Sequence, residues 1–243
     1  DVLTQGVDAI IFGTHDQSAA APLLKKAVKK KMAVVMINSD IADFPTPIHG
    51  VVGYGQRAGT HKIAKWLIDE AAGEKLKVGV ITGQPGYHST ERVGGFLDGI
   101  KGAKNLNVEV FIDGKWNVEG GNTAAMDMLQ AHPDLDVIFA ANDNMAIGAA
   151  LAAKALGRRD MRILGNDGDT SGLEEIAAGK LSATVNTSPF VMGMAAMHAT
   201  LDALNGEFAG GWIETPTTIV NEDNVVGVLQ QPEKLYPKPS KNY

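Results

Sequence analysis

Residues 136–157 read DVIFAANDNMAIGAALAAKALG and contain a complete strand–helix unit. The run DVIFAA is almost continuously apolar, which is typical of a strand buried on both faces of a sheet. The run MAIGAALAAKAL has small and apolar residues at helical spacing, and Gly157 stands where such a helix should end. Between them lie Asn142, Asp143 and Asn144. Because one N-cap is enough for a helix, this junction has more polar residues than a cap requires.

The rest of the chain repeats this alternation of apolar runs and helical segments. Strands are predicted at residues 7–12, 33–37, 77–82, 108–112, 137–140, 162–165 and 182–185. Helices are predicted at residues 18–30, 57–72, 89–100, 121–131, 145–156, 171–178 and 190–204. Strands that alternate with helices form parallel sheets with helices on both faces. The pattern therefore predicts an α/β fold.

Composition narrows the class of protein. The chain has 243 residues, of which 44% are apolar, so it can bury a substantial core. Its net charge of −6 argues against a nucleic-acid or anionic-membrane partner. The absence of cysteine excludes disulfides, thiol nucleophiles and thiolate metal sites.

No apolar run is long enough to span a bilayer. Asp1 begins inside a pattern already under way, so a signal peptide could have been removed or omitted. The proline-rich end, QQPEKLYPKPSKNY, is expected to wrap a surface or fray.

Polar side chains follow nearly every predicted strand. Open parallel sheets bind ligands at the carboxyl ends of their strands, so these residues form the candidate site. They include Asn38 and Ser39, NDN at 142–144, NDGD at 166–169, and Asn186 and Thr187. Turn chemistry explains part of this enrichment but not Arg92 and Trp116 among the same loops. Planar Asp, Asn and Arg groups can hold sugar hydroxyls, and an aromatic ring packs on the C–H face of a sugar. The strand ends therefore indicate recognition of a neutral polyol.

Each of these residues also has an ordinary structural interpretation. Asn142 and Asp167 are common turn formers. Arg92 is equally typical of an exposed helix residue, and Trp116 of a core side chain. Asp143 is predicted to be the N-cap of the helix that follows it. The residue pattern by itself leaves these alternatives open.

Several motifs, in this order and spacing, resemble type I periplasmic sugar-binding proteins, the ribose- and galactose-binding group that supplies ABC importers. The motifs are QGVDAIIFGTHDQSA, GYHSTERVGGFLDGI, AHPDLDVIFAANDNMAIGAALAAKALG, ILGNDGD and GKLSATV. The resemblance runs from Gly6 to about Val220. It implies two doubly wound parallel-sheet lobes that are joined by a three-strand hinge and close on a sugar. The expected lobes are residues 1–53 plus 188–217, and residues 54–187 plus 218–243.

The resemblance also implies which residues contact the ligand. The implied contacts are hydrogen bonds from Arg92, Asn142 and Asp167, stacking on Trp116, and a hinge contribution from Thr187 or Asn186. Asn38 and Ser39 stand where ribose binders carry Asp-Arg. This departure argues against ribose itself and for a different hydroxyl pattern.

A second departure from the family concerns the beginning of the chain. Family members begin with a strand, a helix and a second strand ahead of the segment that corresponds to QGVDAII, together with further ligand contacts. This sequence does not contain them. We therefore expect the first lobe to be incomplete and to expose a hydrophobic edge.

The expected function is that of a binding protein and not of an enzyme. It would capture a small sugar for an ABC permease or a chemoreceptor, in the periplasm or anchored outside the cytoplasmic membrane, as a monomer when full length. One alternative is the effector-binding core of a lactose-repressor-type transcription factor without its DNA-binding domain. Another is an α/β enzyme that uses Asp167 and Glu91 as acid and base. The six histidines lack metal-ligand spacing and the glycines form no complete nucleotide motif, so no catalytic residue, metal or cofactor is expected.

Overall fold

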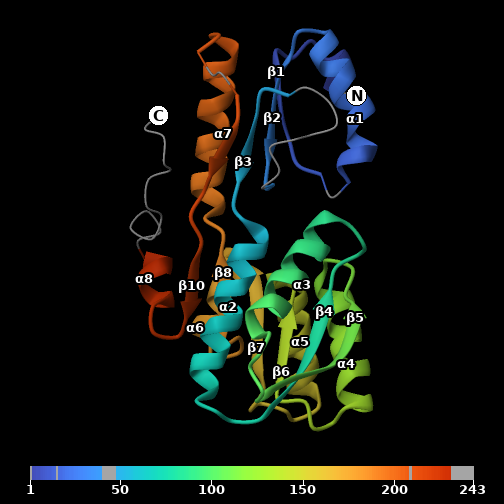
Figure 1. Cartoon of the computed structure of the whole chain (residues 1–243), viewed down its shortest axis with the longest axis vertical. Coiled ribbons are helices and arrows are strands. Elements are labelled where there is room, and N and C mark those ends of the chain that lie inside the picture. The colour runs from blue at the N-terminus through green and yellow to red at the C-terminus, as the bar shows by residue number, and fades with distance from the viewer. Residues whose placement is uncertain (1, 15, 40–47, 208–209, 231–243) are drawn as a thin grey trace. The chain divides into compact units, whose positions relative to one another are not determined.

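A computed structural model describes residues 2–14, 16–39, 48–207 and 210–230 of the chain (Figure 1). These residues fall into two compact units. The first unit comprises residues 2–55 and 188–216, and the second comprises residues 56–187 and 217–230. Within the described residues, the chain passes between them three times, after Gly55, Thr187 and Pro216. From residue 231 onward the proline-rich end, predicted to wrap a surface or fray, lies outside the described residues.

The second unit is built on a six-stranded sheet of order β10-β8-β7-β6-β4-β5. Its strands are β4 (Leu76–Thr82), β5 (Leu106–Asp113), β6 (Val137–Ala140), β7 (Arg162–Asp167), β8 (Ala183–Asn186) and β10 (Thr218–Asn221). Neighbouring strands are parallel except for β10, which runs antiparallel to β8. Because β8, β7, β6, β4 and β5 are parallel neighbours, their carboxyl ends lie along one edge of the sheet.

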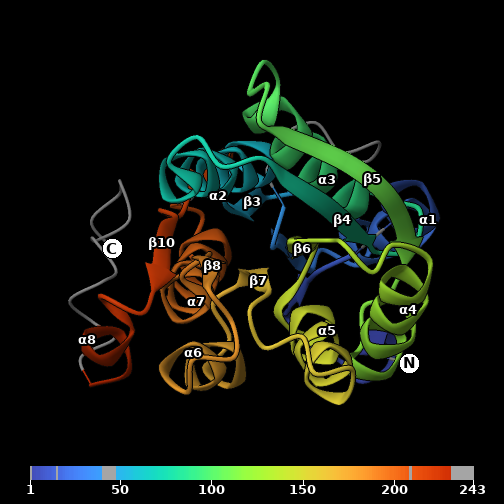
Figure 2. The same cartoon turned by 90° about the horizontal axis from the view of Figure 1, so that it is seen from below.

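Helices cover both faces of this sheet. They are α2 (Gln56–Ala71), α3 (Tyr87–Ile100), α4 (Val118–Ala131), α5 (Asp143–Ala155), α6 (Thr170–Ala177) and α8 (Val225–Gln230). Strand β6 alternates between two cores: Val137 and Phe139 pack with α2 and α3, whereas Ile138 and Ala140 pack with α4 and α5. Figure 2 shows α2 and α3 on one side of β4 and β6, and α5 on the other. Each fully buried large apolar side chain contributes about 1.5–3 kcal/mol to folding.

The first unit is a smaller parallel sheet of order β1-β2-β3-β9. Its elements are the 3-10 turn η1 (Val2–Thr4), β1 (Ala9–Phe12), α1 (Gln17–Lys29), β2 (Ala33–Ile37), β3 (Gly50–Gly53), α7 (Pro189–Leu204) and β9 (Trp212–Glu214). Val34 and Met36 of β2 pack with α1, whereas Val35 packs with α7. The Asp16 carboxylate caps α1 by accepting a hydrogen bond from the Ala19 amide at 2.9 Å.

One face of α7 is apolar and exposed. Its large side chains recur every three or four residues, at Phe190, Met194, Met197, Leu201 and Leu204, and are 46–64% exposed. The opposite face, with Ala195 and Ala199, is buried against the sheet. We call the exposed set the α7 stripe.

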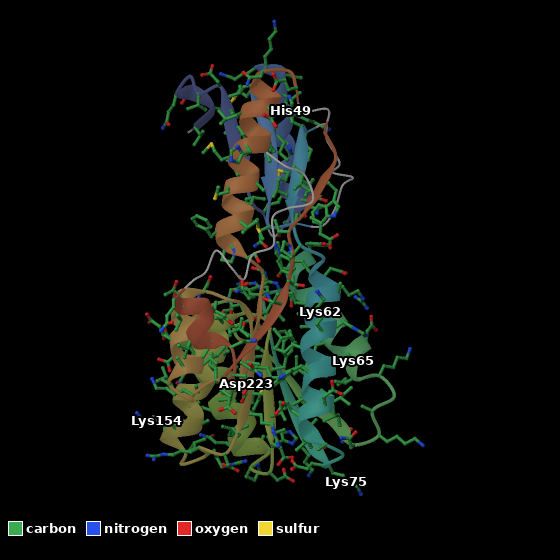
Figure 3. All side chains as sticks on the ribbon, turned by 90° about the vertical axis from the view of Figure 1, so that its left-hand side faces the viewer. His49, Lys62, Lys65, Lys75, Lys154 and Asp223 are labelled. Carbon is green, nitrogen blue, oxygen red and sulfur yellow. The ribbon has the colours of Figure 1, made fainter. Side chains whose placement is uncertain are left out.

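Lys62 and His49, both labelled in Figure 3, each make a polar contact within their own unit. Lys62 Nζ on α2 donates to the carbonyl and hydroxyl oxygens of Thr217, at 3.1 and 2.8 Å, just before β10. The Val34 amide donates to His49 Nδ1 at 2.9 Å, so His49 serves as a structural acceptor in the first unit. In the part of the chain that the structure describes, no helix combines the length and the apolar character needed to cross a membrane.

The α/β prediction is confirmed, and all seven predicted strands and seven predicted helices are present. The sequence analysis missed the 3-10 turn η1, the short strands β3, β9 and β10, and the helix α8. A run of three or four residues carries little periodic signal by itself, and β3, β9 and β10 do not lie in longer apolar runs as β1 and β6 do. They form because distant partners hold them, as β8 holds β10 and β3 holds β9.

Candidate ligand-binding site

The junction between β6 and α5 places Asn142 as the helix cap. Its Oδ1 accepts a hydrogen bond from the Met145 amide at 2.9 Å, and its backbone is extended, as N-caps require. Its Nδ2 donates to the Trp116 carbonyl at 3.3 Å. An amide nitrogen carries two hydrogens, so this bond uses one of its two donors. Asn142 is therefore anchored at both ends of its amide.

Asp143 is the first residue of α5, and the prediction that it caps the helix is wrong. Its carboxylate is fully buried and accepts three hydrogen bonds. The donors are the Thr184 hydroxyl at 2.6 Å and the amides of Gly168 and Asp169 at 2.8 and 3.0 Å. The prediction failed because capping depends on side-chain direction, and the Asp143 side chain points into the interior, where these donors converge.

Arg92, on α3, is buried and hydrogen-bonded to three separate segments. Its Nε donates to Gln56 Oε1 at 3.0 Å, and its Nη1 donates to the Ala141 carbonyl and to Asp167 Oδ1, both at 2.9 Å. The guanidinium carbon lies 5.6 Å from the centroid of the Trp116 ring. Arg92 is thus not an exposed helix residue. It joins the ends of β6 and β7 to Trp116, and its plane is fixed.

Asp167 ends β7 in an unusual backbone conformation. Its φ of 147° is rarely adopted by residues with a side chain, and Gly168 follows with a φ of 78°. The Asp167 side chain is 22% exposed, whereas that of its partner Arg92 is 4% exposed. Burial raises the pKa of Asp167 to about 6, against the lowering effect of Arg92. The carboxylate is therefore ionised at neutral pH and is the accessible half of the ion pair.

The neighbouring strand β8 supplies Asn186 and Thr187. Asn186 lies opposite Asp167 in the parallel ladder. The amide and the hydroxyl of Thr187 both donate to the Asp167 carbonyl, each at 2.9 Å. Both residues are buried, and the end of β8 therefore supports the unusual turn at Asp167.

Trp116 follows β5 and packs on the end of β4. Lys115 and Trp116 both have left-handed backbones, with φ of 56° and 62°. A Cβ added at Gly83 would overlap the Trp116 ring, so the indole rests directly on the Gly83 backbone. Trp116 is half-buried, with part of its surface packed against the core that includes Met145. Trp116 therefore packs against the core with part of its surface and is exposed with the rest.

The second unit thus brings together six of the eight predicted site residues. They lie at the carboxyl ends of its parallel strands and are Arg92, Trp116, Asn142, Asp167, Asn186 and Thr187. The other two, Asn38 and Ser39, belong to the first unit and follow β2. Asn38 has a left-handed φ of 58°, and Ser39 is buried against the backbone of Gly53.

Sequence reasoning missed three residues that build this edge. Gln56 begins α2 and orients Arg92, Gly83 makes room for Trp116, and Thr184 contacts Asp143. Neither a glutamine at a helix start nor a threonine inside a strand carries a distinctive pattern. The one available signal was the NDN run at 142–144, which has more polar residues than a cap requires.

Residues 1–208 match the family model described as the periplasmic binding protein domain. The chain belongs to this family. The ribose import binding protein RbsB of Bacillus subtilis is 31% identical over 216 residues, which cover 89% of this chain and 69% of that protein. The D-ribose/D-allose-binding protein of Pseudomonas aeruginosa is 29% identical over 235 residues, covering 90% and 71%. Both are named as binding proteins, in agreement with the expectation that this family member is not an enzyme.

Solved structures agree with the fold. An ABC transporter periplasmic solute-binding protein from Actinobacillus succinogenes, solved with bound D-allose, superposes with a TM-score of 0.86 at 24% identity, covering 93% of this chain and 81% of that one. A solute-binding protein from Mycobacterium smegmatis, solved with bound glycerol, gives a TM-score of 0.83 at 25% identity, covering 94% and 79%. The periplasmic binding protein type I fold is therefore the fold of this chain.

Proposed function

We propose that this family member is the sugar-binding component of an ABC importer and that its two units are the lobes that close on the sugar. The observation that carries the proposal is the buried Arg92 guanidinium, which is fixed beside both the Asp167 carboxylate and the Trp116 ring. The combination of a carboxylate, an amide and an aromatic face at one sheet edge suits a polyol.

Each group has a defined role in this proposal. The Asp167 carboxylate accepts hydrogen bonds from sugar hydroxyls, and Arg92 keeps it ionised and oriented. Asn142 offers its second N–H donor to a hydroxyl oxygen, since its first is bonded to the Trp116 carbonyl. The Trp116 ring packs on a C–H face of the sugar. Asn186 and Thr187 contribute from the end of β8, and their first effect is to hold Asp167 in place.

The charge balance favours a neutral ligand. Arg92 and Asp167 neutralise each other at 2.9 Å, so an anionic or cationic ligand would find no unmatched partner in this pair. Asn38 and Ser39 are uncharged and would add only hydrogen bonds from the first unit. We therefore propose a pentose or hexose with a hydroxyl pattern different from that of ribose.

The relatives' names support transport over the alternatives. The Bacillus relative is named for import, and neither it nor the Pseudomonas relative is named as a repressor or an enzyme. We accordingly propose a permease as the membrane partner and an extracytoplasmic location, with a monomeric full-length protein. Closure and ligand binding are coupled in this scheme because the bonds from both lobes form only when the lobes meet.

Calorimetry with the natural full-length protein tests the proposal. The panel comprises D-ribose, D-allose, L-arabinose and D-galactose, with thermal unfolding as a second readout. At least one sugar should bind with one-to-one stoichiometry, and a ligand at 100 times its Kd should add about 2.7 kcal/mol to the unfolding free energy. A folded protein that binds none of these sugars, or that turns one over chemically, would contradict the proposal.

A matched pair of variants locates the binding. Asp167→Asn removes the negative charge at the proposed contact while keeping the side-chain shape. Asp98→Asn makes the same change at a carboxylate that is half-exposed and paired with Arg57 on the helix surface. Sugar binding should be lost or weakened by at least about tenfold in the first variant and unchanged in the second.

A further inference from the structure

Asp143 is connected to the proposed ligand site by hydrogen bonds that play no part in the proposed function. Its two carboxylate oxygens serve different segments. Oδ2 accepts from the amides of Gly168 and Asp169, at 2.8 and 3.0 Å, and Oδ1 accepts from the Thr184 hydroxyl at 2.6 Å. One buried carboxylate thus ties the start of α5 to the turn after β7 and to the middle of β8.

Two glycines leave space for the Asp143 carboxylate. A Cβ added at Gly165, on β7, would collide with Asp143 Oδ1, and one added at Gly172, on α6, would collide with Oδ2. Two elements therefore carry glycine where they face this side chain. The pocket admits Asp143 and leaves no room for a bulkier neighbour.

The turn that Asp143 holds is the one that carries Asp167. Asp167 has a φ of 147° and Gly168 a φ of 78°. Residues with a side chain rarely adopt such positive φ values. Such a turn persists only when its surroundings fix it, and the Gly168 and Asp169 amides are the groups that Asp143 binds. Asp167 belongs to this turn, so a shift of the turn would also shift its carboxylate relative to Arg92, to which it is hydrogen-bonded at 2.9 Å.

We propose that Asp143 is a positioning residue for the sugar site: through the amides of Gly168 and Asp169 it sets where the Asp167 carboxylate lies. This inference rests on the proposed role of Asp167 as a ligand contact. Adjacent residues then serve the site in different ways. Asn142 caps α5 and contacts Trp116, and Asp143 fixes the turn that follows the next strand of the sheet.

Burial and the nearby negative charges disfavour ionised Asp143, and its hydrogen bonds offset part of this free-energy cost. Asp167 and Asp169 both face it and disfavour its ionisation, and burial is the largest effect, so the pKa of Asp143 is raised to about 7. Arg92 is paired with Asp167. The Thr184 and Asp169 hydrogen bonds act in the opposite direction and favour the ionised form.

Three variants distinguish a positioning role of Asp143 from a general contribution to stability. Asp143→Ala removes both acceptors. Asp143→Asn can keep one neutral oxygen on the two turn amides while its NH₂ faces the Thr184 hydroxyl. Thr184→Val is the matched control, because it removes a contact of the same carboxylate that does not touch the turn. Affinity is measured by calorimetry with D-allose and D-ribose, and with any panel sugar that binds the wild type, and stability by urea unfolding.

The expected order of affinity loss is Asp143→Ala, then Asp143→Asn, then Thr184→Val. We expect at least about tenfold for the first, a partial rescue by the second, and less than about twofold for the third, although Thr184→Val should also lower the unfolding free energy. The proposal is overturned if folded Asp143→Ala binds within about twofold of wild type. It is equally overturned if Thr184→Val loses as much affinity as Asp143→Ala.

Amide NMR spectra without ligand keep the test independent of sugar binding and of any folding failure of Asp143→Ala. At pH 8, where Asp143 is ionised, Asp143→Asn should move the Gly168 and Asp169 amide protons upfield, since a neutral oxygen is a weaker acceptor, and should also shift the Arg92 Nε–H signal. Thr184→Val should leave these three signals near their wild-type positions. Unchanged signals in Asp143→Asn would refute positioning by Asp143. If no sugar binds the wild type but these shifts occur, the proposed function fails while the positioning by Asp143 stands.

Discussion

The strand ends of the two units use their polar residues differently. In the second unit, Arg92 bonds to residues 36, 49 and 75 positions away in the sequence, and these bonds join separate strand–helix units. After β1 in the first unit, Thr14 and Asp16 bond to each other, and Asp16 accepts from the Ala19 amide, so these partners are two or three residues apart. Local bonds of this kind shape a turn and cap a helix. Long-range bonds fix side chains from several loops relative to one another, as a preformed binding edge requires.

The two units also differ in the apolar helix surface that they expose. The sheet of the second unit has apolar cores on both faces, formed by α2 and α3 on one side and α4, α5 and α6 on the other. The first unit also has a core on each face, but its helix α7 presents the α7 stripe outward. Substitutions at the strand-end residues of the second unit should therefore change ligand affinity, whereas those on the α7 stripe should change association.

The largest effect is expected from Arg92→Met. This variant leaves the Asp167 carboxylate, the Gln56 amide and the Ala141 carbonyl without their guanidinium partner. We expect affinity to fall by at least about 100-fold and the unfolding free energy by about 3 kcal/mol. Arg57→Met is the control, because its ion pair with Asp98 is half-exposed and should cost at most about 1 kcal/mol with no change in affinity. Calorimetry measures the affinity, and urea unfolding measures the unfolding free energy. Equal losses in the two variants would contradict the prediction that the buried arginine contributes more than the exposed one.

Stability of the second unit should fall as pH rises from about 4 to about 7. Burial raises the pKa of Asp143 to about 7 and that of Asp167 to about 6, above their ordinary value of 3.8. A carboxyl group with a raised pKa in the folded state binds its proton more tightly there, so its stabilising effect is complete below pH 4 and is lost as pH rises through the folded pKa. The slope is at most about 1.4 kcal/mol per pH unit for each group.

Affinity should change with pH in the opposite direction, because sugar hydroxyls donate to ionised Asp167. Hydrogen exchange resolves the amides of the two units and so compares their pH dependence directly, and calorimetry at pH 5 and pH 8 gives the affinity. Asp143→Asn should reduce the slope of stability against pH. A slope equal to that of wild type would show that Asp143 does not titrate in this range.

Trp116→Ala should weaken binding by about tenfold through loss of the stacking surface. Trp66→Ala serves as the control, because Trp66 is a half-buried residue of α2 that packs against the core of the opposite face. Both variants should lower the unfolding free energy, but only Trp116→Ala should reduce affinity. Fluorescence quenching on sugar addition, measured in each variant, would identify which tryptophan reports the ligand.

The smallest change in stability is expected on the α7 stripe. Met194→Lys and Met197→Lys replace side chains that are about half-exposed, so each should alter the unfolding free energy by no more than about 0.5 kcal/mol. Together they should reduce self-association of the 243-residue chain, because a row of exposed apolar side chains favours it. Light scattering after size exclusion measures the association. Met192→Lys, at a buried position of the same helix, should instead be strongly destabilising. A large cost for Met197→Lys would mean that the stripe is covered in the folded protein.

Much of the fold followed from local patterns. The periodicity of apolar residues identified seven strands and seven helices, and Gly157 was correctly predicted at a helix end, where its backbone is left-handed. Strand-end position drew attention to Arg92 and Trp116 but left their ordinary structural roles open, and the structure brings the Arg92 guanidinium carbon to 5.6 Å from the centroid of the Trp116 ring. Pattern reasoning succeeded here because strand and helix periods are properties of neighbouring residues.

The sequence determined that a polar junction follows β6, but only the tertiary structure decided what each residue there does. Asn142 and Asp143 are both good caps, and nothing in their immediate neighbours distinguishes them. The choice is made by Thr184, Gly168 and Asp169, which lie 25 to 41 positions away and converge on the Asp143 carboxylate. Their donors require a buried acceptor, so Asp143 turns inward and Asn142 takes the cap. The direction of a side chain is set by distant packing partners, and these meet only in the folded chain.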